Sequence, residues 1–275
     1  MNRRIVALAV PALLAAILAA GMPIFAQSAT TTPPPAPTLR FFQQFITDAA
    51  IVDKQWWGAE MRWQGGAVPP FENADGFLLT PTIAISPVKN LEVGGTISYI
   101  KYDLDRSFHG TSGETGLGDL TIYGKYRFLH QGHFDVTGGV TFSLPTGSES
   151  DGLGTGKFVP SIFGAMRMQA GDGSFLGEAG FRFNHDSTVL DADLQAKTST
   201  FLGGGYIWEP AKSLAVSGEL TVESERYDGA SSDFRLTGGV QWMGLPHSVL
   251  RGALSAGLSD GAPDYEIILG YAYTF

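Results

Sequence analysis

The sequence predicts an all-β protein, a transmembrane antiparallel up-and-down β-barrel of twelve strands. Apolar and polar residues alternate with a period of two in one segment after another from Trp56 to the end of the chain, which is the pattern of strands with one apolar and one polar face. The connections between these segments alternate between tight turns and longer polar loops. Glycine is also abundant, with 36 residues in 275, while only 16% of the residues are charged. Such a composition favours closely packed strands.

The first 26 residues are predicted to be a signal peptide. Arg3 and Arg4 give the start a positive charge, and Ile5–Ala20 is almost purely apolar. Small residues then lead to a cleavage point at Ala26, with Ser28 or Ala29 as alternatives. These are the three parts of a secretory signal. The apolar run is shorter than the ~20 residues that a membrane-spanning helix needs. Because the chain has no cysteine, a lipoprotein anchor at the junction is excluded.

Residues 27–55 are predicted to connect the signal peptide to the barrel. Ser28–Pro37 reads SATTTPPPAP, a composition typical of a solvated polyproline-like linker. Leu39–Asp53 then places apolar residues at roughly helical spacing. A short amphipathic helix at or inside the barrel mouth and an irregular lead-in both fit this segment.

The barrel itself is predicted to span residues 56–275. Its clearest strand is Gly118–Phe128, in which Ile122 and Phe128 share an apolar face while Lys125 and Arg127 share the polar one. Strands of 9–11 residues are long enough to cross a membrane when tilted. The predicted strands are 56–64, 76–86, 90–102, 117–129, 133–145, 157–169, 174–184, 198–208, 213–225, 233–243, 248–258 and 265–275.

The lengths of the connections favour a membrane barrel over a soluble sandwich. Leu129–His133 and Glu209–Ser213 are tight turns, whereas Asp103–Gly116, Pro145–Gly156 and His185–Lys197 are long polar loops at the opposite end. Outer-membrane barrels have short periplasmic turns, longer external loops and an even number of strands. We therefore expect the protein in the cell outer membrane with both termini in the periplasm. A secreted sandwich that buries its apolar face is the alternative.

Three segments carry a resemblance to known outer-membrane proteins. The last strand, Tyr265–Phe275, ends in phenylalanine and looks like the signal read by the outer-membrane assembly machinery. Gly116–Phe128 (GLGDLTIYGKYRF) and Ser143–Gly156 (SLPTGSESDGLGTG) resemble the outer-membrane family named for the meta-pathway of phenol degradation. The resemblance covers roughly residues 56–275. It implies a single barrel and a role in passing small, often aromatic, compounds.

Alternation also predicts which charged residues face the interior. A charge facing lipid at the bilayer midplane costs ~2–4 kcal/mol, so charged strand residues are expected inside. Either they pair across the lumen and hold the strands in register, or they line a hydrated passage. Among them, Arg235 is the expected partner of the acidic strand 213–225. The predicted lumen-lining residues are Glu60, Arg62, Glu92, Asp119, Lys125, Arg127, Asp135, Arg167, Glu178, Arg182, Glu219, Glu223, Arg235, Arg251 and Glu266.

Other sites receive little support from the sequence. His185–Ser187 contains the three residue types of a hydrolase triad, His, Asp and Ser, but consecutive residues rarely converge on one substrate. His130 and His133 flank a turn without a third ligand for a metal. The net charge of −9 argues against nucleic acid. We therefore expect no catalytic centre, no metal and no cofactor.

The predicted function is that of an outer-membrane channel or transporter. Eight strands leave an interior filled by side chains and sixteen leave an aqueous channel, so twelve strands predict a narrow or gated pore for small solutes, including aromatic or hydrophobic ones. Expected partners are outer-membrane lipids, these solutes and the assembly machinery through Phe275, with the protein as a monomer. The alternatives are an outer-membrane enzyme acting on lipid or peptide and a structural or adhesive barrel that transports nothing.

Overall fold

The computed structural model describes residues 46–52, 54–66, 74–106, 110–189 and 192–275. The predicted signal peptide and the Pro-rich part of the linker lie outside these residues. Among the described residues, no helix is both apolar enough and long enough to cross a bilayer. The strands are β1 (Gln55–Gly65), β2 (Ala74–Val88), β3 (Leu91–Thr96), β4 (Tyr99–Arg106), β5 (Gly110–Leu117), β6 (Leu120–Gln131), β7 (Phe134–Leu144), β8 (Val159–Ala170), β9 (Gly173–Phe183), β10 (Ser187–Val189), β11 (Ala192–Leu194), β12 (Thr198–Ala211), β13 (Leu214–Glu223), β14 (Asp233–Trp242), β15 (Ser248–Gly257) and β16 (Tyr265–Thr274).

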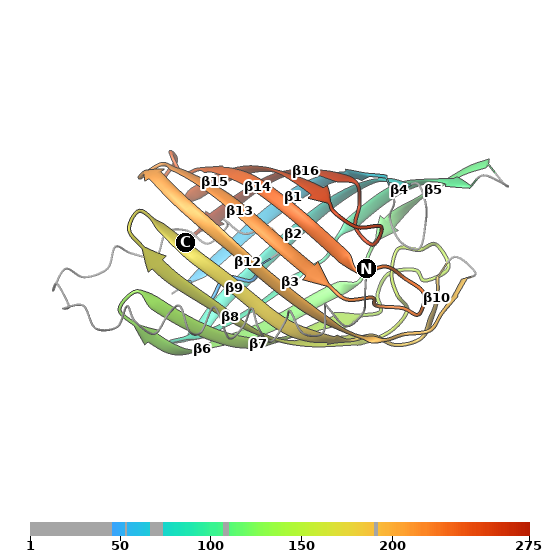
Figure 1. Ribbon diagram of the computed structural model, residues 1–275, viewed down its shortest axis with the longest axis horizontal. Helices are drawn as coiled ribbons and strands as arrows, with labels where there is room; N and C mark the ends of the chain where they lie inside the picture. Colours follow the sequence, from blue (N-terminus) through green and yellow to red (C-terminus); the bar gives the residue numbers. More distant parts are fainter. Residues whose placement is uncertain (1–45, 53, 67–73, 107–109, 190–191) are drawn as a thin grey trace. The chain divides into compact units, whose positions relative to one another are not determined.

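The strands close into a twelve-stranded antiparallel barrel, as the sequence predicts (Figure 1). Each barrel strand pairs with its neighbours in the chain, and β1 pairs with both β2 and β16, which closes the ring. β3 and β4 together occupy the third position, and β5 and β6 the fourth. Closure leaves no edge strand with unpaired backbone groups in the hydrocarbon.

The third barrel strand differs from the prediction. Instead of one strand over 90–102, pairing with β2 passes from β3 to β4 across a gap at residues 97–98. Pro81 of β2 lies opposite this gap. Because proline has no N–H to donate to the ladder, Pro81 fits where pairing is already broken. The hydroxyl of Thr96 donates to the carbonyl of Pro81 at 2.9 Å.

Two of the predicted long loops contain strands. Asp103–Gly116 is largely a β-hairpin, because β4 and β5 stay paired from Tyr99 to Gly110. This hairpin extends beyond its neighbours at the upper right of Figure 1. His185–Lys197 contains the short β10–β11 hairpin at the same end. Both hairpins pair strands that are close together in the chain. Their sequences lack the alternation of apolar and polar residues that marks a wall with two faces.

The two faces of the wall separate by polarity. Leu254, Leu236 and Ile122 are 65%, 51% and 41% exposed, and none of these side chains would meet water in a bilayer. In contrast, Lys125 and Glu266 are 4% and 1% exposed on the opposite face. At the short-turn end, the rings of Trp57, Tyr273 and Phe275 are in contact, which matches the aromatic girdle expected at the headgroups.

Candidate functional site

A chain segment that precedes the first strand lies inside the barrel. Residues 46–52 contain bends but no helix, and Ile46, Ala49, Ala50 and Ile51 are all at most 4% exposed. Of the two predicted forms of Leu39–Asp53, the described part has the irregular one; residues 39–45 and 53 lie outside the described range. The segment therefore brings an apolar surface into a lumen lined by charges.

Three inward side chains hold this segment by its backbone and by Asp48. Lys125 Nζ donates to the carbonyl oxygens of Asp48 at 2.8 Å and Ala50 at 3.0 Å. Arg167 Nη1 donates to Asp48 Oδ2 at 2.8 Å. The hydroxyl of Thr137 donates to the carbonyl of Ala49 at 2.5 Å. These groups come from β6, β8 and β7, so the segment lies against that wall.

Acidic residues of the same wall complete the contact. Glu178 of β9 accepts the backbone N–H of Thr47 at 2.9 Å. Glu92 of β3 accepts the hydroxyl of Tyr123 at 3.0 Å and lies 3.5 Å from Lys125 Nζ. Each buried charge of this group is thus satisfied by a partner, which buried charges require.

The glycines of β12 make room for the segment. A Cβ atom on Gly203 would lie 2.8 Å from Ile46 Cγ1, and one on Gly205 would lie 3.3 Å from Ile46 Cδ1. The first distance is shorter than two carbon atoms tolerate. Beside Gly205 lies Glu219, which is 2% exposed. The run Gly203–Gly205 of this strand is therefore where Ile46 packs.

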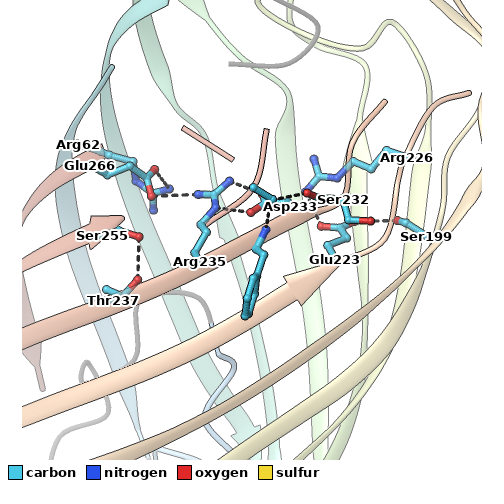
Figure 2. Close-up of polar contacts among 12 residues, drawn as sticks. Arg62, Ser199, Glu223, Arg226, Ser232, Asp233, Arg235, Thr237, Ser255 and Glu266 are labelled. Atoms are coloured by element: carbon cyan, nitrogen blue, oxygen red, sulfur yellow. Dashed lines mark hydrogen bonds and ion pairs between the residues drawn. The ribbon is translucent and has the colours of Figure 1, made fainter. Parts of the chain in front are cut away.

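A second charge network lies on the wall where the ring of strands closes, and Figure 2 shows its residues Arg62, Arg235 and Glu266. Glu266 accepts Arg62 at 3.2 Å and Arg235 at 3.0 Å. Arg62 also donates to Glu60 at 2.9 Å, and Glu60 accepts Arg251 through its other oxygen. The network links β14, β16, β1 and β15, so it crosses the closure of the barrel.

Glu223 is the centre of a separate cluster. It accepts Arg182 Nε at 2.9 Å, the hydroxyl of Ser199 at 2.7 Å and Arg226 Nη2 at 2.5 Å (Figure 2). The predicted pairing of Arg235 with the acidic strand β13 is wrong. Arg235 instead donates to Glu266 and to both oxygens of Asp233. The register explains this difference. Asp233 stands opposite Glu223 and binds Arg235, which lies on the same strand as Asp233.

Three of the predicted lumen-lining residues have contacts with loops or beside turns at the ends of the barrel strands. Asp119 lies in the gap between β5 and β6, where its carboxylate accepts Gly147 N at 3.0 Å, Thr155 N at 2.9 Å and the Thr155 hydroxyl at 3.0 Å. Asp119 thus anchors the loop between β7 and β8, and the two segments that carry the family resemblance meet at this residue. Arg127 donates to the side chain of Asn90, and Asp135 accepts His130 at 2.6 Å, both beside tight turns.

Two cavities open next to the inward charges. One of about 360 Å³ is lined by Thr47, Phe163, Arg182 and Phe201, among others, and so adjoins the inserted segment. The other, of about 290 Å³, is lined by Glu60, Arg62, Thr80, Thr82 and Arg251 among others, on the wall formed by β1, β2, β15 and β16. The segment therefore leaves part of the interior unfilled.

Sequence reasoning did not single out Asp48 or Thr137. The only signal for Asp48 is a carboxylate between the apolar residues Ile46 and Ala49. Nothing in the alternation marks one inward hydroxyl, such as that of Thr137, from the others. Both residues become functional candidates only because the chain places residues 46–52 against β6–β8.

The described residues do not assemble the other candidate sites. The hydroxyl of Ser187 is buried without a hydrogen-bond partner, and Asp186 accepts the backbone N–H of Ala196 at 2.6 Å. A triad needs a nucleophile hydrogen-bonded to its base, and this arrangement does not supply one. In the part of the chain that the structure describes, no group of three His, Cys, Asp or Glu side chains could hold a metal ion.

Comparisons with known proteins agree with the fold. The sequence model of a family described as "Putative MetA-pathway of phenol degradation" matches residues 80–275. The COG4313 outer membrane channel from Pseudomonas putida F1 is similar in structure, with a TM-score of 0.65 and 14% identity over 83% of this chain and 97% of that one. No curated protein sequence matches the chain.

Barrels with other functions are similar as well. The KdgM porin gives a TM-score of 0.52 at 11% identity, covering 80% of this chain and 99% of its own. The β domain of the Bordetella autotransporter BrkA gives 0.52 at 14% identity, covering 81% and 100%. At such identities the likeness concerns the barrel fold alone.

Proposed function

Because the chain belongs to the family described as "Putative MetA-pathway of phenol degradation", we propose that it is an outer-membrane channel for small solutes, including aromatic or hydrophobic ones. The observation that carries the proposal is the interior of the barrel. A barrel with a purely structural role can fill its lumen with its own side chains. Here the lumen instead holds residues 46–52 and two cavities.

The inserted segment acts as the closure of this channel. The segment is held by the packing of Ile46 against β12 and by a few polar contacts, chiefly those of Lys125, Arg167 and Glu178. Such contacts exchange readily for water, because each is replaced by an equivalent hydrogen bond when the segment leaves. Displacement of the segment widens the passage without any change in the barrel wall.

The inward charges set which solutes pass. Arg62 and Arg235 both pair with Glu266, and Glu223 pairs with Arg182 and Arg226. A lumen whose charges are paired presents no strong field of one sign, so it selects weakly for simple ions. Selection by size and by apolar surface is the expected result, as a channel for small aromatic solutes requires.

Reconstitution of the purified protein tests the proposal. We expect small neutral aromatic compounds to enter proteoliposomes faster than empty liposomes, and planar bilayers to show low, intermittent ion conductance. A variant that lacks residues 46–52 should give larger and more sustained conductance. If neither wild type nor this variant passes ions or solutes, the channel function is wrong.

The cellular placement is part of the same proposal. A signal peptide that ends at Ala26 would export the chain, and both termini would lie in the periplasm. N-terminal sequencing of the protein purified from outer membranes should begin at Gln27. A start at Met1 would contradict the export signal. Size-exclusion chromatography with light scattering tests the expected monomer.

A further inference from the structure

The 360 Å³ cavity contains hydrogen-bond donors that the protein itself does not use. Ser161 is 4% exposed and lines this cavity, yet its hydroxyl has no hydrogen-bond partner among the described residues. Buried hydroxyls are nearly always hydrogen-bonded, so an unpaired one that faces a cavity marks a place for a ligand. Ser161 stands directly opposite Arg182 in the β8–β9 register.

Arg182 adds free donors at the same position. Among the described residues, its guanidinium has one hydrogen bond, from Nε to Glu223, so both of its Nη groups are available. The side chain is 31% exposed. Arg226, which shares Glu223, is 45% exposed. The two arginines thus share a single carboxylate that already accepts three donors.

The cavity is lined by more positively charged than negatively charged groups, which agrees with these free donors. Its lining has four guanidinium groups and three carboxylates, and one of those carboxylates, Glu178, accepts the backbone N–H of Thr47. The unused hydrogen-bonding capacity around Arg182 is therefore that of donors. A planar guanidinium with two free Nη groups binds a carboxylate better than it binds a neutral hydroxyl.

Aromatic rings form the apolar part of the cavity. Phe163 of β8 and Phe201 of β12 are both paired with Gly180 of β9, so they flank it from either side. The ring of Phe201 lies under Arg182, with the guanidinium carbon 6.0 Å from the ring centroid. A flat apolar group next to a carboxylate would meet rings on one side and donors on the other.

We propose that this cavity binds small aromatic carboxylates, with the carboxylate on Arg182 and Ser161 and the ring against Phe163 and Phe201. The site rests on the proposed channel function and gives that channel a solute class. The site favours aromatic acids over neutral aromatics, because neutral aromatics contact the same apolar surface without using the free donors.

Equilibrium dialysis on the full-length protein in detergent tests the site without requiring transport. The probes are radiolabelled benzoate, its neutral analogue benzyl alcohol and the cation benzylamine. We expect benzoate to bind at least about tenfold more tightly than the other two, since charge-assisted hydrogen bonds are stronger than neutral ones. Equal or tighter binding of either analogue, or no binding of benzoate, overturns the proposal.

Two variants locate the binding. Arg182→Gln should weaken benzoate binding by about tenfold or more, and Ser161→Ala by about threefold to tenfold. Ser161→Ala removes a hydroxyl that bonds to nothing in the protein, so folding should be unaffected. Ser187→Ala is the matched control, because its hydroxyl is also buried and unpartnered but lies in β10, outside the cavity. Benzoate affinity unchanged in both test variants overturns the assignment.

The uptake assay separates this proposal from the channel function. Neutral aromatic flux into proteoliposomes with no selective benzoate binding leaves the channel in place and refutes the carboxylate site. Selective benzoate binding without flux of any solute supports the site and refutes the channel.

Discussion

Asp48→Asn should open the channel by loosening the inserted segment. The amide has the shape of the carboxylate and can still accept the backbone N–H of Ala50, which lies 2.9 Å from Asp48 Oδ1. What the substitution removes is the negative charge 2.8 Å from Arg167 Nη1. In the described part of the chain, Arg167 would then keep Glu209, at 3.9 Å, as its acidic partner.

The size of the effect follows from the hydrogen bond that changes. When the amide oxygen accepts the N–H of Ala50, the NH2 group faces Arg167 and cannot accept its hydrogen bond. A hydrogen bond to a charged group contributes about 1.5–3 kcal/mol. The closed state should therefore lose about 1.5–3 kcal/mol relative to the open state, which is a factor of about 10–150 in their ratio. Lys125 and Thr137 still hold the backbone of the segment, so we expect partial rather than permanent opening.

Single-channel recording in planar bilayers measures this ratio as open probability. Asp135→Asn is the control, because Asp135 is an inward acid that pairs with His130 and Arg127 away from the segment. The double variant Asp48→Asn/Arg167→Gln should open little more than Asp48→Asn, since both changes break one interaction. An open probability that Asp48→Asn leaves at the wild-type value, or that Asp135→Asn raises equally, would refute the reasoning.

Four further changes test other parts of the structure. Asp119→Ala leaves three donors of the loop over 146–157 without their acceptor, so limited proteolysis should cut this loop several-fold faster. Glu266→Ala leaves two half-buried guanidinium groups without their shared carboxylate, although Arg62 keeps Glu60 and Arg235 keeps Asp233. It should lower the free energy of unfolding by about 1.5–3 kcal/mol, measured as a lower temperature at which the folded band is lost in SDS gels. Leu254→Arg places a charge on a lipid-facing position. It should lower the free energy of unfolding in lipid vesicles by ~2–4 kcal/mol, as measured by urea titration. Hydrogen bonds to Asp228 and Glu225 raise the pKa of Lys197 above its ordinary 10.5. These contacts should therefore persist at and below pH 10.5 and be lost as the pH rises through the raised pKa of the folded protein. NMR of the labelled lysine can follow this titration.

The strand faces were predictable because each depends on its own segment. Ile122 faces lipid and Lys125 faces inward for the same reason, namely that a charge in the hydrocarbon is costly and the side-chain period of a strand is two. The interruption of pairing at Pro81 also has a local cause, namely its missing N–H. The break at residues 97–98 was missed because polar Ser98 and apolar Ile97 continue the alternation through it.

The partners of the inward charges were not predictable in the same way. Alternation says that Arg235 points inward but not whether it meets the acids of β13 or those of β14 and β16. That choice depends on register, which places Asp233 opposite Glu223 and brings Glu266 within reach across the closed ring. A side chain several ångströms long can meet any of these neighbours, so only their positions decide.

By itself the sequence determined the architecture of this protein: twelve two-faced strands, apolar on the outside, with charges directed inward. Those features arise from residues close together in the chain and from the solvent each face meets. Only the tertiary structure decided what fills the interior. Asp48 and Arg167 are 119 positions apart, and nothing local to either one indicates the other. Closing the barrel brings them together, because it surrounds residues 46–52 with side chains from strands that are distant in sequence.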